Sequence, residues 1–117
     1  MKTQSAKAKG RNLQKYVAGK IREFFGLSEN DVKSTPMGSP GRDILMSDKA
    51  FEELPVTIEC KNTKKFPSIA ALEQSEYNTE KDTIPAVVWK PFGKGMSESI
   101  IYMNFEKFLL WYKKEKE

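Results

Sequence analysis

Apolar residues recur every three or four positions in three stretches of the chain, a spacing that places them on one face of a helix. The first predicted helix begins near Asn12 and ends before Gly26, a residue type that commonly stops helices. The second runs from Pro67 to about Thr79, and Asn104 is suited to cap the third. We expect the following positions to face inward: Leu13, Tyr16, Val17, Ile21, Phe24 and Phe25 in the first helix, Ile69, Leu72 and Tyr77 in the second, and Phe105, Phe108, Leu109 and Tyr112 in the third.

Short apolar runs bounded by turn residues predict five strands. They lie within residues 31–37, 42–47, 56–62, 84–90 and 98–104, and segment 48–55 is expected only to connect two of them. The run 84–90 is almost continuously apolar, which is typical of the middle of a mixed or parallel sheet. The resulting order, α-β-β-β-α-β-β-α, predicts an α/β fold with a small mixed sheet flanked by helices.

The chain of 117 residues suits one domain with a single core. Residues 1–10 have little apolar content and are expected to form a basic flexible arm, leaving residues 11–117 as the domain. The net charge is only +4, but residues 1–22 hold seven basic side chains and no acid, whereas the remainder carries 13 basic and 16 acidic ones. This positive N-terminal part suits a polyanion such as DNA. A merely solubilising tail explains it about equally well.

Composition excludes several classes of site. The chain has no histidine and one cysteine, which removes Ser-His-Asp and Cys-His nucleophile systems and makes a zinc site very unlikely. One cysteine cannot form an internal disulfide, so we expect a reducing, cytoplasmic location. No apolar stretch approaches the roughly 20 residues that span a bilayer, and the basic N-terminus lacks the apolar part of a secretory signal. Catalysis would therefore depend on carboxylates, lysines and an oxygen-binding cation.

The segment "VTIECKN", residues 56–62, ends in such a set of side chains. Alternation along a strand places Glu59 and Lys61 on the same side and turns Cys60 away into the packing. Asp43 follows the turn "GSPG" at the start of a neighbouring predicted strand, so Asp43 and Glu59 are expected to hold one cation jointly. A cation between carboxylates polarises a phosphate oxygen, while Lys61 orients water or stabilises phosphoryl charge. This set therefore suits phosphodiester hydrolysis.

An arbitrary E-x-K in a strand is more often an exposed ion pair. Three observations favour a site here: Asp43 follows a Gly-Pro-Gly turn and precedes an apolar strand, the E-x-K ends the next apolar strand, and a basic helix lies upstream. A helix, an Asp in one strand and E-x-K in the next together resemble the PD-(D/E)XK nucleases. Within that superfamily, the chain resembles most the archaeal-type Holliday junction resolvases and related phage-type endonucleases, over about residues 9–105. Supporting segments are "KGRNLQK", "MGSPGRD" and "ALEQSEYN".

The resemblance implies a restriction-endonuclease-like core and further site residues. Gln14 stands where the resolvases have a glutamate in the first helix, and Glu23 is the weaker alternative. Gln74 is expected near the scissile phosphate or the attacking water, or else as a solvated helix position. Cys60 would contribute to the metal only through its backbone carbonyl. The metal would be Mg²⁺, with Mn²⁺ as a substitute. Residues expected to contact DNA are Lys9, Arg11, Ser39, Arg42, Lys64 and Lys65, although each charge alone is more often an ordinary surface residue.

The first hypothesis is therefore a Mg²⁺-dependent endodeoxyribonuclease acting on branched DNA as a homodimer, in the host cytoplasm if phage-encoded. A nicking or restriction-like nuclease with the same site is a close variant. The other hypotheses are a non-catalytic DNA-binding module on the same fold and a partner-binding protein with solvated charges. The intact set of Asp43, Glu59 and Lys61 favours catalysis, because carboxylates without a cation repel DNA. The aromatic segment with Tyr102, Phe105, Phe108 and Trp111 offers a dimer face.

Overall fold

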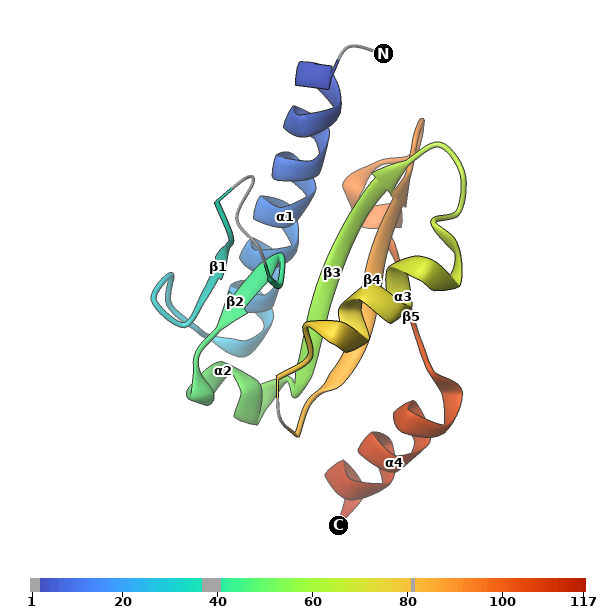
Figure 1. The fold of residues 1–117 in the computed structure, drawn as a ribbon. Coiled ribbons are helices and arrows are strands. Elements are labelled where there is room, and N and C mark those ends of the chain that lie inside the picture. Colours follow the sequence, from blue (N-terminus) through green and yellow to red (C-terminus); the bar gives the residue numbers. More distant parts are fainter. Residues whose placement is uncertain (1–2, 37–40, 81) are drawn as a thin grey trace.

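The computed structural model describes residues 3–36, 41–80 and 82–117, and within them helices surround two small sheets (Figure 1). The elements follow the chain in the order α1 (Thr3–Phe25), β1 (Val32–Ser34), β2 (Ile44–Met46), α2 (Asp48–Glu53), β3 (Val56–Thr63), α3 (Ser68–Tyr77), β4 (Ile84–Pro91), η1 (Met96–Glu98), β5 (Ile100–Met103) and α4 (Phe105–Lys116). The predicted order of three helices and five strands is confirmed, and α2 and the 3₁₀ turn η1 are additions to it.

The strands form an antiparallel hairpin and a mixed three-stranded sheet. β1 pairs with β2, and the larger sheet has the order β3-β4-β5. β3 and β4 are parallel, with Val56 opposite Ile84 and Thr63 opposite Pro91, and β5 returns antiparallel along β4. β4 is therefore the central strand, as its apolar run predicts. β3 is an edge strand.

The two faces of the larger sheet are covered by different helices, α1, to the left of β3 in Figure 1, and α3, which lies in front of the sheet. Alternation along β3 sends Ile58 and Cys60 into one cluster with the buried residues of α1. On the other face, Val87 of β4 packs with Ala71 and Leu72 of α3. The main core cluster consists of Leu13, Val17, Ala18, Ile21, Leu27, Val32, Ile44, Met46, Ala50, Val56, Ile58, Cys60, Ala86 and Val88.

Local signals explain where the terminal helices stop and start. Gly26 has φ of +65°, a left-handed conformation that glycine adopts without a steric penalty, and α1 ends there as expected. Asn104 caps α4, since its side chain accepts a hydrogen bond from the backbone N–H of Lys107 at 3.0 Å. Both ends were predictable because each depends on one residue type at one position.

Four expectations about the helices are corrected. The first concerns positions that were expected to face inward but are exposed: Phe24 and Phe25 of α1, and Phe105, Phe108, Leu109 and Tyr112 of α4. Residues 3–10 belong to α1 and do not form an arm, because alanine and lysine favour helix and no proline interrupts the segment. The connector 48–55 contains α2, which Ser47 caps by accepting from the backbone N–H of Ala50. On α3, Leu72 is buried as expected, but Ile69 and Tyr77 are 61% and 91% exposed. The small residues Ala71 and Ser75 take the inward positions instead.

No helix in the described ranges combines the length and the apolar character needed to cross a membrane.

Candidate active site

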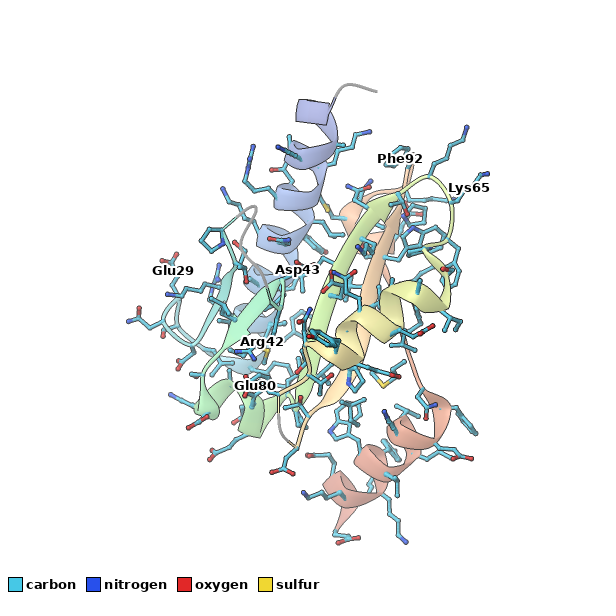
Figure 2. All side chains as sticks on the ribbon, viewed as in Figure 1. Glu29, Arg42, Asp43, Lys65, Glu80 and Phe92 are labelled. Atoms are coloured by element: carbon cyan, nitrogen blue, oxygen red, sulfur yellow. The ribbon has the colours of Figure 1, made fainter. Side chains whose placement is uncertain are left out.

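Asp43 lies at the junction of the two sheets. It immediately precedes β2, and its Oδ2 accepts a hydrogen bond of 2.8 Å from the backbone N–H of Cys60 in β3. β2 was expected to lie beside β3, but the two strands are not paired. The Asp43 side chain, rather than a β ladder, connects them. The carboxylate thereby also satisfies a backbone donor on the free edge of β3. Figure 2 shows Asp43 between β2 and β3.

Glu59 and Lys61 share the α3 face of β3, as strand alternation predicts. Glu59 lies opposite Val87 in the parallel pair, and Val87 packs against α3. Glu59 is only 4% exposed, and its Oε1 lies 3.8 Å from Nζ of Lys61. The lysine remains about one third exposed. A buried carboxylate thus holds an amine that solvent and a ligand can still reach.

Burial raises the pKa of both carboxyl groups, and Asp43 adds to the shift of Glu59. Burial, and then the negative charge of Asp43, raise the pKa of Glu59 to about 7, while Lys61 opposes the shift. Burial also raises the pKa of Asp43 above its ordinary value, against the opposing effect of the Cys60 N–H. Two adjacent carboxyls of this kind share protons as a pair. At neutral pH a divalent cation would satisfy the same oxygens without protonation.

Cys60 is a packing residue, as predicted. Its side chain is 8% exposed within the core cluster of α1 and β3, and burial raises the pKa of its thiol. A thiol that resists ionisation is a poor nucleophile. The backbone of Cys60, unlike its side chain, is directed toward Asp43. The N–H and C=O of one strand residue point to the same side of the strand. The N–H meets Asp43, so we expect the Cys60 carbonyl to face the side of Asp43 as well.

This donor set fits Mg²⁺ or Mn²⁺. Asp43, Glu59 and the Cys60 carbonyl are all hard oxygen donors, which these cations prefer. In the part of the chain that the structure describes, no three His, Cys, Asp or Glu side chains form a metal-binding group. The protein therefore supplies two carboxylates, and water or phosphate oxygens would complete the coordination.

In the described part of the chain, no hydrogen bond or ion pair joins either predicted α1 candidate to this pair. Gln14 is 8% exposed, and its buried Oε1 has no hydrogen-bond partner among the described residues. However, α1 covers the Cys60 face of β3, opposite the face of Glu59. Glu23 is exposed and lies 3.6 Å from Lys20, so it behaves as an ordinary surface residue. Of the two residues, Gln14 is therefore the one whose buried side-chain oxygen lacks a hydrogen-bond partner among the described residues.

The remaining two predicted polar contacts gain no support. Gln74 is exposed on α3, while the helix turns Ala71, Leu72 and Ser75 inward. This placement fits a solvated helix position. Ser39 lies outside the described residues.

Several predicted DNA-contacting lysines meet at one end of the sheet. Because β3 and β4 are parallel, the loops that follow them leave from the same edge, where Lys64, Lys65 and Lys94 are exposed. Lys9 reaches this edge from α1: its carbonyl accepts from the Asn62 side chain at 3.3 Å, and its Nζ lies 4.0 Å from the ring centre of Phe92. Figure 2 shows Lys65 and Phe92 at this end. We call Lys9, Lys64, Lys65 and Lys94 the basic edge. Arg11 is exposed nearby along α1.

Arg42 does not belong to the basic edge. Its guanidinium is paired with the carboxylate of Glu80, and the two side chains point toward each other in Figure 2. The opposite edge of the sheet, where β3 and β4 begin, is rich in acids from α2 and from the segment before β4: Asp48, Glu52, Glu53, Glu80 and Asp82. The predicted role of Arg42 in DNA binding is therefore less consistent with its position than that of the lysines. Charge is separated along the strands, with the carboxylate pair between the two ends.

No protein-family model, no curated protein and no solved structure matches the chain. The site is thus interpreted from its own geometry.

One aromatic side chain near the site was not recognised in the sequence. Phe66 is 52% exposed and packs against Trp89, which lies opposite Lys61 in the β3–β4 pair. From the sequence alone, Trp89, Trp111 and the phenylalanines are expected to serve the core or a dimer face rather than to stack on bases. The available signal was the order Lys64, Lys65, Phe66, Pro67, which places an aromatic residue in a basic, proline-ended loop where burial is improbable.

Proposed function

We propose that this protein is a metal-dependent endodeoxyribonuclease of the PD-(D/E)XK type that hydrolyses phosphodiester bonds in branched DNA. The observation that carries the proposal is the convergence of Asp43 and Glu59 beside Lys61, with the Asp43 carboxylate bonded to the backbone of the strand that bears the other two. Buried paired carboxylates destabilise a fold unless a proton or cation is shared between them. If these residues had only a structural role, the buried pair would lower the free energy of unfolding with no compensating function.

Each residue has a chemical task in this proposal. Asp43 and Glu59 hold the divalent cation, which when bound supplies positive charge that polarises the phosphate. Lys61 directs its ammonium toward the phosphate oxygens, where it stabilises the negative charge that grows during attack, and it orients the incoming water. The 3.8 Å contact with Glu59 restricts the lysine to the site. Placement of the scissile phosphate follows from the basic edge, which binds the flanking backbone.

The charge distribution supports a polyanionic substrate. Residues 61–72 and 83–97 contain lysines but no acid, and they include the loops at the basic edge. The acids at the opposite edge repel DNA, so the DNA strand that is cut is expected to bind at the basic edge and extend toward Lys61. The preference for branched DNA and the homodimer come from the resemblance to resolvases, and exposed apolar residues of β5 and α4 provide the surface for a second copy. These are Ile100, Ile101, Phe105, Phe108, Leu109, Leu110 and Tyr112.

The test is a cleavage assay on a four-way junction, a linear duplex and a single strand, with Mg²⁺, Mn²⁺ or EDTA. We expect the wild type to cut the junction in either metal and not in EDTA. Lys61→Ala and Asp43→Asn should abolish cleavage, whereas Glu23→Gln, which alters an exposed acid of α1, should not. Cleavage in EDTA, or cleavage by both site variants, would refute the assignment. Preferential cutting of duplex would support the restriction-like variant, and binding without cleavage in any metal would support a non-catalytic DNA-binding protein.

A further inference from the structure

Phe66 presents an exposed aromatic ring that packs on the rings of Trp89 and Tyr102. Its ring centre lies 5.2 Å from that of Trp89 at an interplanar angle of 83°, and 4.8 Å from that of Tyr102 at 46°. Such edge-to-face and tilted contacts are favourable for aromatic pairs. Although both neighbours are partly buried, Phe66 itself remains 52% exposed.

The two supporting rings are themselves fixed by hydrogen bonds. Nε1 of Trp89 donates to the carbonyl and the hydroxyl of Thr63, at 3.2 Å and 3.1 Å. The hydroxyl of Tyr102 donates to the carbonyl of Ser68 at 3.2 Å, which secures the start of α3 just after Phe66. The exposed ring is therefore pre-organised, and binding a flat partner on it requires little further loss of side-chain freedom.

The ring is connected to the proposed catalytic lysine through Trp89. Trp89, on which Phe66 packs, is the direct neighbour of Lys61 across the parallel pair. Lys61, Trp89 and Tyr102 lie on the same face of the sheet, because Tyr102 is opposite Val87 and both pack with α3. Trp89 lies about one strand spacing, roughly 5 Å, from Lys61, and the ring centre of Phe66 lies 5.2 Å from that of Trp89. A group stacked on Phe66 would therefore be separated from the lysine by Trp89.

The surroundings of the ring indicate what binds there. Lys64 and Lys65 directly precede it, both are exposed, and no acid occurs between residues 61 and 72. An apolar protein segment would gain nothing from these lysines. A nucleotide, by contrast, combines a flat aromatic base with a phosphate, and base stacking on an aromatic side chain contributes substantially to binding of single strands.

We propose that Phe66 is a stacking platform for one unpaired base of the DNA, with Lys64 and Lys65 holding the adjoining phosphates. The platform selects the substrate, because bases in an intact duplex are stacked on one another and offer no free face, whereas a base at a branch or bulge does. This inference rests on the proposed nuclease function for its consequence in cleavage. The binding step itself does not depend on catalysis.

Binding is tested in EDTA with a short oligothymidine as the probe. In a Trp111→Phe background, Trp89 is the single tryptophan and reports on a base stacked beside it. We expect the oligonucleotide to quench this fluorescence. Phe66→Leu keeps apolar packing under Trp89 but removes the aromatic face, and it should weaken binding roughly tenfold. Phe66→Tyr should retain binding. Phe24→Leu, at a 75% exposed aromatic of α1, is the matched control and should have no effect.

Cleavage provides the second measurement. The ratio of cleavage rates on a duplex with one unpaired base and on the perfect duplex should fall about tenfold in Phe66→Leu and remain unchanged in Phe66→Tyr. Binding by Phe66→Leu within twofold of the wild type would overturn the platform, as would an unchanged cleavage ratio. The two proposals fail separately: loss of metal-dependent cleavage with Phe66-dependent oligothymidine binding intact refutes only the nuclease, and cleavage indifferent to Phe66 refutes only the platform.

Discussion

The carboxylate of Asp43 accepts a 2.8 Å hydrogen bond from the backbone N–H of Cys60, and this contact joins the β1–β2 hairpin to the edge of the three-stranded sheet. The negative charge of Asp43 also contributes to raising the pKa of the buried Glu59 carboxyl. Asp43 therefore combines a structural task with its proposed chemical one, and the two tasks respond differently to substitution.

Asp43→Asn and Asp43→Ala should separate these tasks. An amide oxygen still accepts from the Cys60 N–H, so Asp43→Asn should fold with stability close to that of the wild type while losing cleavage. Asp43→Ala leaves that N–H without a partner and should lower the free energy of unfolding by about 1–3 kcal/mol. Urea denaturation of both variants in EDTA measures this difference. Equal stability of the two variants would contradict the structural role of the contact.

The raised pKa of Glu59 predicts an unusual dependence of stability on pH. Since the folded state holds a proton up to about pH 7 that the unfolded chain releases near its ordinary pKa of 4.5, the metal-free protein should lose stability as the pH rises between these values. The contribution is on the order of 3 kcal/mol. Asp43, whose pKa is also raised, acts in the same direction.

Comparison with Glu59→Gln isolates this effect from the other titrating groups. Because the amide carries no charge at any pH, the variant should be more stable than the metal-free wild type at pH 8, and the difference between the two proteins should vanish below about pH 4.5. Mg²⁺ should restore much of the stability of the wild type at pH 8 and leave Glu59→Gln almost unaffected. A difference that is constant from pH 4 to pH 8 would be inconsistent with the buried pair.

DNA affinity should distinguish Lys65 from Arg42. Lys65 is exposed at the basic edge, so Lys65→Ala should reduce the slope of log affinity against log salt concentration by about 0.9. The guanidinium of Arg42 is already paired with Glu80, so Arg42→Ala should leave the slope unchanged. Fluorescence anisotropy of a labelled junction at several salt concentrations, in EDTA, measures both. A reduced slope for Arg42→Ala would return that residue to the DNA interface.

The apolar surface of α4 should govern dimer formation. α4 has no buried residue, and Leu109 and Leu110 are 46% and 69% exposed. Leu109→Glu would place a charge in the interface and should raise the dimer dissociation constant at least tenfold, or about 1.4 kcal/mol. Ile69→Glu, at a 61% exposed position on α3, is the matched control. Sedimentation equilibrium measures both, and a wild type that remains monomeric would exclude the dimer.

Most of the secondary structure was predictable because it depends on short-range periodicity. Alternation in "VTIECKN" is sufficient to place Glu59 and Lys61 on one face and Cys60 on the other, and the structure agrees. The helix end at Gly26 and the cap at Asn104 are equally local. The pattern could not show that α2 forms, since that helix has six residues and a single buried one, Ala50.

The residues that complete the site depended on contacts between distant parts of the chain. Asp43 meets Cys60 across 17 positions, and Arg42 meets Glu80 across 38. The sequence does not show that Arg42 is paired with an acid or that the Phe66 ring is left exposed. Both follow from how the helices cover the two faces of the sheet. Local sequence determines which way a side chain points within its own element, because that direction is set by backbone geometry. Only the tertiary structure decides what lies opposite, because that depends on the packing of every other element.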